Sequence, residues 1–258
     1  MNPNRWRLDD QVALVTGASR GIGLATAREL AGFGAHLLLV SRSAEALEEV
    51  RAEVGEEFPG RRVLAFAADL AEPEQRLDLF DWIADLGCGL NLLVNNAGDN
   101  VRGPTIGYDD ASYRHLFQLN LDSVYELSRL AHPLLAKHGS AAIVNVASVS
   151  GMRHVRTGSP YGMTKAAVIQ LTRNLACEWA SDGIRVNAVA PWYIRTARSE
   201  GALADPAYYD EVLARTPLGR IGEADEVAAA IAFLCLPAAS YLSGVCLPVD
   251  GGFTAYGF

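Results

Sequence analysis

The sequence predicts an α/β fold: a doubly wound parallel sheet of seven strands in one domain that spans residues 1–258. Short apolar runs alternate along the chain with longer segments of helical periodicity. A glycine-rich turn follows the first apolar run directly. The 258 residues, of which 50% are hydrophobic, are enough to bury one sizeable core.

Seven apolar runs provide the predicted strands. Each run is almost continuously apolar, as expected for strands that helices cover on both faces. The first run, a helix from about residue 22 and the second run make a βαβ unit, which is the building block of a Rossmann-type sheet. The predicted strands span residues 12–15, 35–40, 63–67, 92–94, 142–146, 184–189 and 245–249.

The segment 191–222 is the one long irregular connection, and it contains a short helical pattern near residues 207–214. Connections of this length in compact domains often form lids. We therefore expect a substrate lid here, with a passive surface excursion as the alternative.

Composition and charge bear on partners and location. The formal net charge is −8, whereas nucleic acids and anionic membranes attract basic surfaces, so neither is an expected partner. No apolar run precedes the first strand, which predicts a cytoplasmic protein without secretory signal or membrane span. No metal site is predicted, and reduced buried thiols are expected at four positions that lack metal-ligand spacing. These positions are Cys88, Cys177, Cys235 and Cys246.

The turn after the first strand, residues 16–23, has the spacing T-G-x-x-x-G-x-G. Glycines let the backbone turn tightly and approach a pyrophosphate closely. The free N–H groups and the dipole at the start of the following helix favour negative charge. We therefore expect a dinucleotide cofactor, bound here by Gly17, Ser19, Arg20, Gly21, Ile22 and Gly23.

The end of the second predicted strand indicates which dinucleotide is used. An acidic residue there usually binds a free ribose 2′-hydroxyl, but this chain has Ser41 and Arg42. Together with Arg20, Arg42 forms a guanidinium pair suited to a 2′-phosphate. This predicts NADP(H) as cofactor. The alternative is that one or both arginines are ordinary solvated surface residues.

Three side chains are candidates for proton transfer. Tyr161 and Lys165 are four residues apart at the start of a helical segment, so both project from one helix face. A nearby ammonium group stabilises a phenolate and lowers the pKa of the tyrosine. Ser148 follows a predicted strand at the end where ligands of such sheets collect. The set suits hydride transfer between a nicotinamide and a carbonyl or secondary alcohol carbon.

These motifs, with residues 95–98 (NNAG) and Asn120, resemble the short-chain dehydrogenase/reductase family over nearly the whole chain. The resemblance implies that Tyr161 is the catalytic acid/base and that Ser148 orients the substrate oxygen. It also implies that Lys165, besides acting on Tyr161, holds the nicotinamide ribose. Asn120 is implied to support a water-linked proton relay.

The same resemblance implies further cofactor contacts. Asp69 should contact the adenine, residues 96–98 should line the cofactor channel, and Ile194 and Thr196 should contact the carboxamide. One departure is Trp192, which follows a proline where the family usually has glycine, and which adds bulk near the nicotinamide. The expected cofactor residues beyond the glycine turn are Ser41, Arg42, Asp69, Leu70, Asn96, Ala97, Gly98, Tyr161, Lys165, Pro191, Ile194 and Thr196.

Within the family the chain resembles tropinone-reductase-like proteins in scaffold segments that do not identify a substrate, at residues 5–8, 175–180, 216–220, 231–241 and 250–255. The substrate-facing segments 99–102 and 149–156 and the lid are rich in arginine. Several guanidiniums would repel the protonated amine of tropinone, which favours an anionic or polar carbonyl compound. Alternatively, these arginines face solvent or pair with acidic neighbours. The candidate substrate residues are Ser148, Ser150, Arg153, His154, Arg156, Tyr161, Trp192 and Tyr193.

Other functions share much of this sequence pattern. A 3-oxoacyl-[acyl-carrier-protein] reductase has the same catalytic residues but must dock an acidic partner, which the net acidity disfavours. A sugar or polyol dehydrogenase and a non-catalytic redox sensor are further alternatives. The resemblance also implies a homotetramer or homodimer, assembled through the helix that begins at Tyr161 and the helix around residues 120–135.

Overall fold

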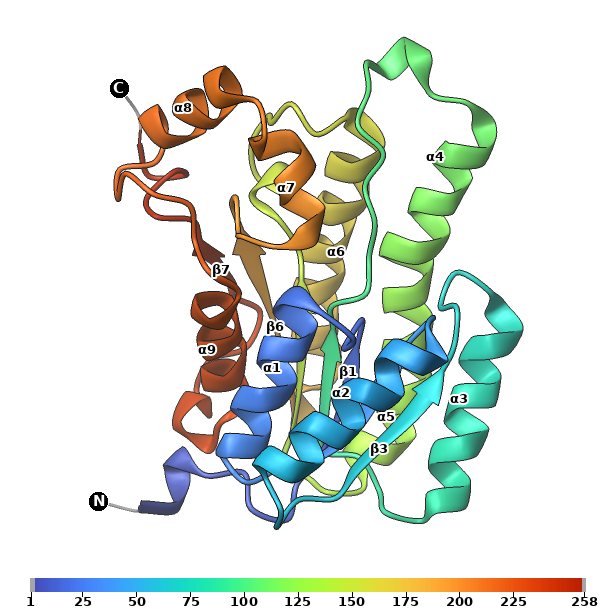
Figure 1. Ribbon diagram of the computed structural model, residues 1–258. Helices are drawn as coiled ribbons and strands as arrows, with labels where there is room; N and C mark the ends of the chain where they lie inside the picture. The colour runs from blue at the N-terminus through green and yellow to red at the C-terminus, as the bar shows by residue number, and fades with distance from the viewer. Residues whose placement is uncertain (1–2, 257–258) are drawn as a thin grey trace.

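A seven-stranded parallel sheet lies between two layers of helices in the computed structural model, which describes residues 3–256 (Figure 1). The strand order β3-β2-β1-β4-β5-β6-β7 confirms the predicted doubly wound α/β fold. The first two and last two residues of the predicted domain lie outside the described residues. The strands are β1 (Val12–Thr16), β2 (His36–Ser41), β3 (Val63–Ala67), β4 (Leu92–Asn95), β5 (Ala141–Val146), β6 (Ile184–Pro191) and β7 (Cys246–Val249).

The helices divide between the two faces of the sheet. Helices α1, α2 and α9 contribute to the hydrophobic cluster on one face, and α3, α5 and α6 to the cluster on the other. The helices are α1 (Gly21–Gly32), α2 (Ala44–Glu57), α3 (Pro73–Leu86), α4 (Asp110–Phe117), α5 (Ser123–Ala136), α6 (Ser159–Glu178), α7 (Ala197–Leu203), α8 (Pro206–Ala214) and α9 (Ala224–Cys235).

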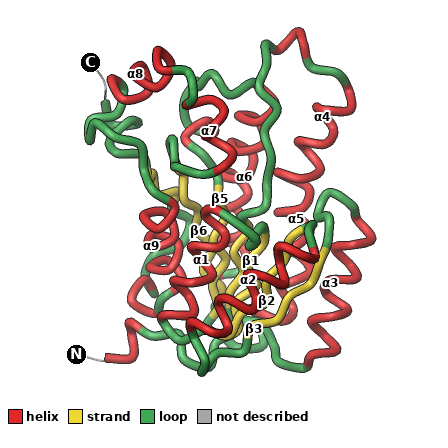
Figure 2. Tube along the Cα trace, in the orientation of Figure 1, coloured by secondary structure: helices red, strands yellow, loops and turns green. Residues whose placement is uncertain are grey.

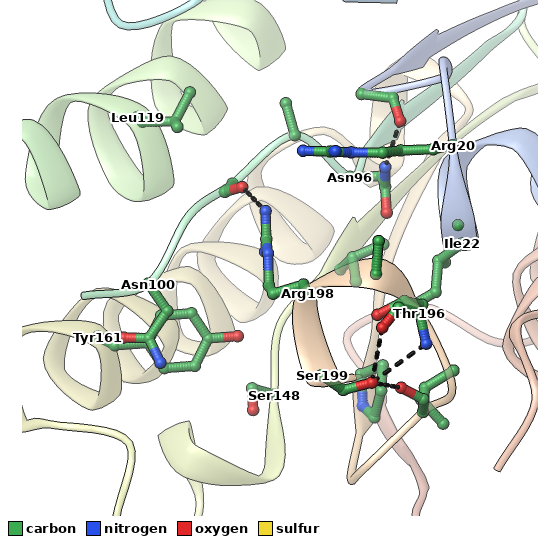
Figure 3. Close-up of a pocket in the computed structure, with 18 of the residues that line it drawn as sticks. Arg20, Ile22, Asn96, Asn100, Leu119, Ser148, Tyr161, Thr196, Arg198 and Ser199 are labelled. Atoms are coloured by element: carbon green, nitrogen blue, oxygen red, sulfur yellow. Dashed lines mark hydrogen bonds between the residues drawn. The ribbon is translucent and has the colours of Figure 1, made fainter. Parts of the chain in front are cut away.

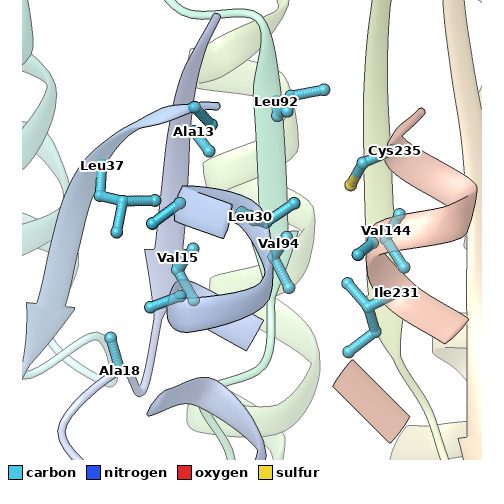
Figure 4. Close-up of a cluster of buried hydrophobic side chains, with 14 of the residues drawn as sticks. Ala13, Val15, Ala18, Leu30, Leu37, Leu92, Val94, Val144, Ile231 and Cys235 are labelled. Atoms are coloured by element: carbon cyan, nitrogen blue, oxygen red, sulfur yellow. The ribbon is translucent and has the colours of Figure 1, made fainter. Parts of the chain in front are cut away.

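The central strands are apolar throughout because both of their faces are buried. Along β1, Ala13 and Val15 belong to one core cluster, whereas Val12 and Leu14 belong to the other. Figure 4 shows the first of these clusters, with Ile231 of α9 packed over the sheet. The alternation of strand side chains therefore divides one apolar run between two cores.

The sheet changes direction between β1 and β4. From β1 the chain proceeds outward to β2 and β3, whereas β4 lies on the other side of β1 and leads to β5. Parallel sheets bind ligands at such a point, beside the carboxyl ends of the strands. The loops that follow these ends gather at one end of the molecule with α7 and α8 (Figure 2).

The helical structure differs from the prediction in two segments. The segment predicted around residues 120–135 begins earlier, with α4, and passes through one π-helical turn, η3 (Gln118–Asp122), into α5. In the segment 191–222, α8 matches the predicted helical pattern, but α7 was not predicted. Helix α7 starts at a capping box between Thr196 and Ser199, a signal with serine in place of the usual acidic or amide partner.

The four cysteines differ in burial. Cys235 is buried and Cys88 and Cys246 are partly buried, but Cys177 is exposed, so the prediction that all four are buried is wrong for Cys177. All four are free thiols. None of the helices in residues 3–256 has the length and apolar character needed to cross a membrane.

The turn from β1 to α1 is so tightly packed that its glycines leave no room for a side chain. A Cβ atom added to Gly23 would lie 2.2 Å from the carbonyl oxygen of Gly17 and 2.6 Å from the Asn96 Nδ2 atom. Gly17 and Gly21 adopt positive φ angles of 65° and 56°, which favour glycine. The turn therefore requires glycine at these positions on steric grounds alone.

We expect Gly23→Ala to lower the free energy of unfolding by about 1–3 kcal/mol, because backbone atoms have to move to admit the methyl group. Gly55→Ala is the matched control, since a Cβ atom there would meet nothing within 4 Å in helix α2. The control should gain about 0.5–1 kcal/mol. Urea unfolding of the two variants measures this, and equal stabilities would contradict the close packing of the turn.

Candidate functional site

A cavity of about 970 Å³ lies at the carboxyl ends of the strands, where the sheet changes direction. Figure 3 shows it, with Arg20 and Tyr161 on opposite sides. Most of the residues predicted to bind cofactor or substrate line this one cavity. They are Gly17, Ser19, Arg20, Gly21, Ile22, Ser41, Arg42, Leu70, Asn96, Ala97, Gly98, Ser148, Ser150, Tyr161, Lys165, Pro191, Trp192, Tyr193, Ile194 and Thr196.

The start of α1 faces this cavity and fits an anionic group. Arg20 is the N-cap residue, and its side chain makes no capping hydrogen bond, so the first N–H groups of the helix are available to a ligand. The absence of a side chain at Gly21 keeps the approach open, and Thr196 is the nearest wall. A dinucleotide pyrophosphate fits this arrangement of residues.

The part of the cavity between the start of α1 and the end of β2 carries positive charge. Arg20, Ser41 and Arg42 all line it, and in the described structure neither arginine is ion-paired with a carboxylate. No acidic residue stands at the end of β2, where Ser41 and Arg42 follow one another. The two guanidiniums and the serine hydroxyl are the donors that a phosphate group accepts from.

Ser148, Tyr161 and Lys165 come together at the other side of the cavity. Ser148 follows β5 at the start of the 3₁₀ turn η4 (Val149–Gly151), and the other two lie one turn apart in α6. The Lys165 ammonium lies 5.7 Å from the centre of the Tyr161 ring and donates a 2.8 Å hydrogen bond to the Val146 carbonyl oxygen. The β5 strand thereby fixes the lysine beside the tyrosine.

The electrostatics at Tyr161 differ from the expectation that Lys165 lowers its pKa. Burial raises the pKa of Tyr161, and the positive charge of Arg198, a hydrogen bond with Ser148 and the charge of Arg102 oppose this. Burial, and then the charge of Arg198, lower the pKa of Lys165 to about 7. Near neutral pH, therefore, the phenol is protonated and the lysine is only partly charged.

Three predicted residues do not line the cavity but support its walls. The buried Asn120, in the π turn, accepts a 2.8 Å hydrogen bond from the Asp99 N–H and donates one of 2.8 Å to the Asp99 carbonyl oxygen. The Asp69 carboxylate accepts from the Ala71 N–H, which fixes the loop after β3. Gly23 is buried against Gly17.

Arg153, His154 and Arg156 were expected to face the substrate, and the structure does not place them in this cavity. Arg153 is exposed and lines no wall of it. His154 and Arg156 line a separate cavity of about 240 Å³, and Arg156 forms an ion pair with Glu211 of α8. All three residues follow the η4 turn and are exposed, so they do not contribute to the cavity wall that contains Ser148.

Trp192, at the position where the family usually has glycine, forms a wall between the two cavities and lines both. Its indole Nε1 donates a 3.1 Å hydrogen bond to the Thr216 hydroxyl, and its ring stacks on Phe253 at 3.8 Å between centroids. The indole is thereby fixed by contacts outside the main cavity.

Sequence reasoning included several further lining residues only as members of segments, or not at all. Arg102 and Arg198 belong to the arginine-rich segments and line the cavity. Asn100 also lines it, and its buried Oδ1 atom accepts no hydrogen bond from the described residues. Tyr208 of α8 lines the smaller cavity and bonds to Arg102 and Tyr193, and it had no functional signal in the sequence because Arg102 lies 106 positions away.

Comparisons with known proteins agree with this geometry. A family model described as enoyl-(acyl carrier protein) reductase matches residues 17–254. A tropinone reductase homologue of Arabidopsis thaliana is 48% identical over 255 residues, which cover 98% of this chain and 96% of the relative.

Two solved structures are similar over nearly the full chain. A gluconate 5-dehydrogenase from Burkholderia cenocepacia, in complex with NADP and tartrate, is 34% identical with a TM-score of 0.93, over 98% of this chain and 99% of its own. An L-sorbose reductase from Gluconobacter frateurii, with NADPH and L-sorbose, is 31% identical with a TM-score of 0.92, over 98% and 99%. The glycine turn, the Ser148, Tyr161 and Lys165 cluster and these full-length matches together show that the chain belongs to the short-chain dehydrogenase/reductase family of oxidoreductases.

Proposed function

We propose that the protein is an NADP(H)-dependent oxidoreductase that interconverts a ketone and a secondary alcohol. The observation that carries this proposal is the placement of Ser148, Tyr161 and Lys165 in the cavity that also contains the glycine turn. When bound, the nicotinamide cofactor supplies or accepts the hydride. The protein residues then have to bind the cofactor and the substrate, orient them, and exchange one proton with the substrate oxygen.

Each residue of the cluster has a distinct task. In ketone reduction the Tyr161 hydroxyl gives its proton to the carbonyl oxygen. Burial raises its pKa and so weakens it as an acid, whereas the charges of Arg198 and Arg102 and the hydrogen bond with Ser148 oppose this effect. Ser148 holds the carbonyl oxygen by a hydrogen bond. Lys165 binds the ribose side of the cofactor, and Asn120 holds the Asp99 backbone and supports a water-linked proton relay.

Residues 191–222 serve as the substrate lid in this proposal. Pro191, Trp192, Tyr193, Ile194 and Thr196 line the cavity, and α7 and α8 follow them directly. The side chains of Tyr193, Val212 and Ile221 form a small hydrophobic cluster of the lid itself, separate from the main core. A segment with its own small core can move as a unit relative to the sheet.

A homotetramer or homodimer through α5 and α6 is also part of the proposal. Tyr125 of α5 and Met163 of α6 are 49% and 51% exposed, which leaves apolar area on the outer faces of these helices. Exposed apolar patches of this kind are typical of surfaces that a second subunit covers.

We expect Tyr161→Phe to reduce turnover of ketones by about 100-fold to 10,000-fold, because it removes the proton donor and little else. NADPH consumption with a panel of ketones measures the turnover, and quenching of tryptophan fluorescence measures NADPH binding. Binding should be unchanged. A wild-type protein that binds NADPH and turns over no ketone would support the redox sensor instead.

We expect Arg42→Ala to raise the KM for NADPH by about 10-fold to 100-fold, because it removes charged hydrogen bonds to the 2′-phosphate. The KM for NADH should change little. Arg51→Ala in α2 is the matched control, since that arginine is exposed and paired with Glu48. Equal changes for both cofactors would show that Arg42 does not bind the 2′-phosphate.

The proton-transfer proposal also predicts a pH dependence. Arg198 favours the charged phenolate of Tyr161, so Arg198→Gln should raise the tyrosine pKa further. Alcohol oxidation needs the phenolate as base, so its rising limb in kcat/KM should move to higher pH by roughly one unit. Arg220→Gln, which loses a surface ion pair with Glu226 and a hydrogen bond to the Ile221 carbonyl oxygen, should leave the profile in place. A downward shift in Arg198→Gln would contradict this electrostatic role.

A further inference from the structure

Arg102 differs from the other arginines around the lid in its partners. Its guanidinium donates to the Tyr193 hydroxyl at 3.2 Å and to the Tyr208 hydroxyl at 3.4 Å. The guanidinium carbon also lies 5.6 Å and 6.0 Å from the centres of these two rings. Arg102 is exposed and lines the cavity, so it lies at the mouth.

Carboxylates compensate the charge of the neighbouring arginines but not that of Arg102. Arg195 pairs with Glu223 and Arg198 with Asp99, and Arg156 shares Glu211 with Arg215. Within residues 3–256, Arg102 is hydrogen-bonded only to the two phenols and has no carboxylate partner. One positive charge therefore stays uncompensated at this wall of the cavity.

The two tyrosines position Arg102 without neutralising it. Burial, with a hydrogen bond between the Tyr193 and Tyr208 hydroxyls, raises the pKa of Tyr193 to about 12, so this phenol stays neutral at physiological pH. The two phenols accept only two of the five N–H donors that a guanidinium carries. A positioned guanidinium with free donors is suited to a carboxylate, whose two oxygens match its fork.

This charge is close to the reacting centre and away from the phosphate-binding end. Both Arg102 and Arg198 act electrostatically on Tyr161, whereas Arg20 lies across the cavity from Tyr161 (Figure 3). Because Asp99 already lies beside Arg198, the unpaired positive charge of Arg102 stands on the substrate side together with the partly charged Lys165. An unpaired guanidinium there suits a carboxylate and opposes binding of a cationic amine.

Hydrogen bonds from other elements fix the backbone around Arg102. Asn120 holds both backbone groups of Asp99, and the Tyr108 hydroxyl donates a 2.6 Å hydrogen bond to the Val101 carbonyl oxygen. The segment 99–102 therefore has a defined path from β4 to the mouth of the cavity. A binding group held in this way loses little conformational freedom when a ligand arrives.

We propose that Arg102, positioned by Tyr193 and Tyr208, binds a carboxylate of the substrate, so that the substrate is a keto acid or the corresponding hydroxy acid. This inference rests on the proposed ketone reduction, and it names the substrate class of that same site. It replaces Arg153 and Arg156 with Arg102 as the residue that recognises the anion.

The test compares keto acids with their uncharged amides, for example 4-oxocyclohexanecarboxylate with 4-oxocyclohexanecarboxamide, and levulinate with levulinamide. Wild-type kcat/KM with NADPH should be at least about 10-fold higher for each acid than for its amide. Arg102→Gln should abolish this preference by lowering kcat/KM for the acid alone, and Arg102→Lys should restore part of it. Arg195→Gln, a lid arginine paired with Glu223, should keep the wild-type preference.

The possible results test the carboxylate subsite and the proposed ketone reduction independently of each other. Turnover of acid and amide at equal rates would leave the ketone reductase in place and overturn the carboxylate subsite. Equal losses for both substrates in Arg102→Gln would show that Arg102 only holds the lid through its tyrosines, which also overturns the subsite. If wild type turns over none of these four compounds and none of the ketone panel, the proposed reaction fails, and calorimetry of acid and amide with the NADPH-bound protein decides the subsite separately.

Discussion

The site depends on the connection between β1 and β4 through the Thr16 side chain. The Thr16 hydroxyl donates a 3.2 Å hydrogen bond to the Val94 carbonyl oxygen and accepts from the N–H groups of Asn96 and Ala97, at 2.9 Å and 3.0 Å. The Asn96 amide in turn donates to the carbonyl oxygens of Thr16 and Gly17. These bonds hold the glycine turn against the chain that follows β4, and so set where one wall of the cavity stands relative to the other.

A second set of buried polar contacts extends this frame to α6. The Asn95 amide donates to the Asn145 side-chain oxygen at 2.9 Å, and the Asn145 amide donates to the Thr172 hydroxyl at 2.9 Å. Buried polar groups are costly unless they are paired, so such a chain fixes the orientation of the elements that it joins. Helix α6 carries Tyr161 and Lys165, and these contacts therefore fix them relative to the sheet.

Apolar periodicity and glycine spacing were enough to predict the sheet, its seven strands and the glycine turn. These features are local, because strand burial on both faces and a positive φ angle each constrain the residue at that position. Two features were not predicted correctly. Helix α7 starts at a capping box with an unusual partner, and Cys177 lies on the outward side of an otherwise largely apolar helix, where neighbouring residues do not reveal which face is covered.

The sequence by itself determined the fold, the family and the residues that stand at the carboxyl ends of the strands, because these follow from local pattern and spacing. Only the tertiary structure decided which arginines keep an uncompensated charge. Arg156 is neutralised by Glu211, 55 positions away, whereas Arg102 meets Tyr193 and Tyr208, 91 and 106 positions away. Charge compensation depends on which side chains meet in space, and residues so distant in the chain are brought together only by the packing of the segment 191–222 against the rest of the domain.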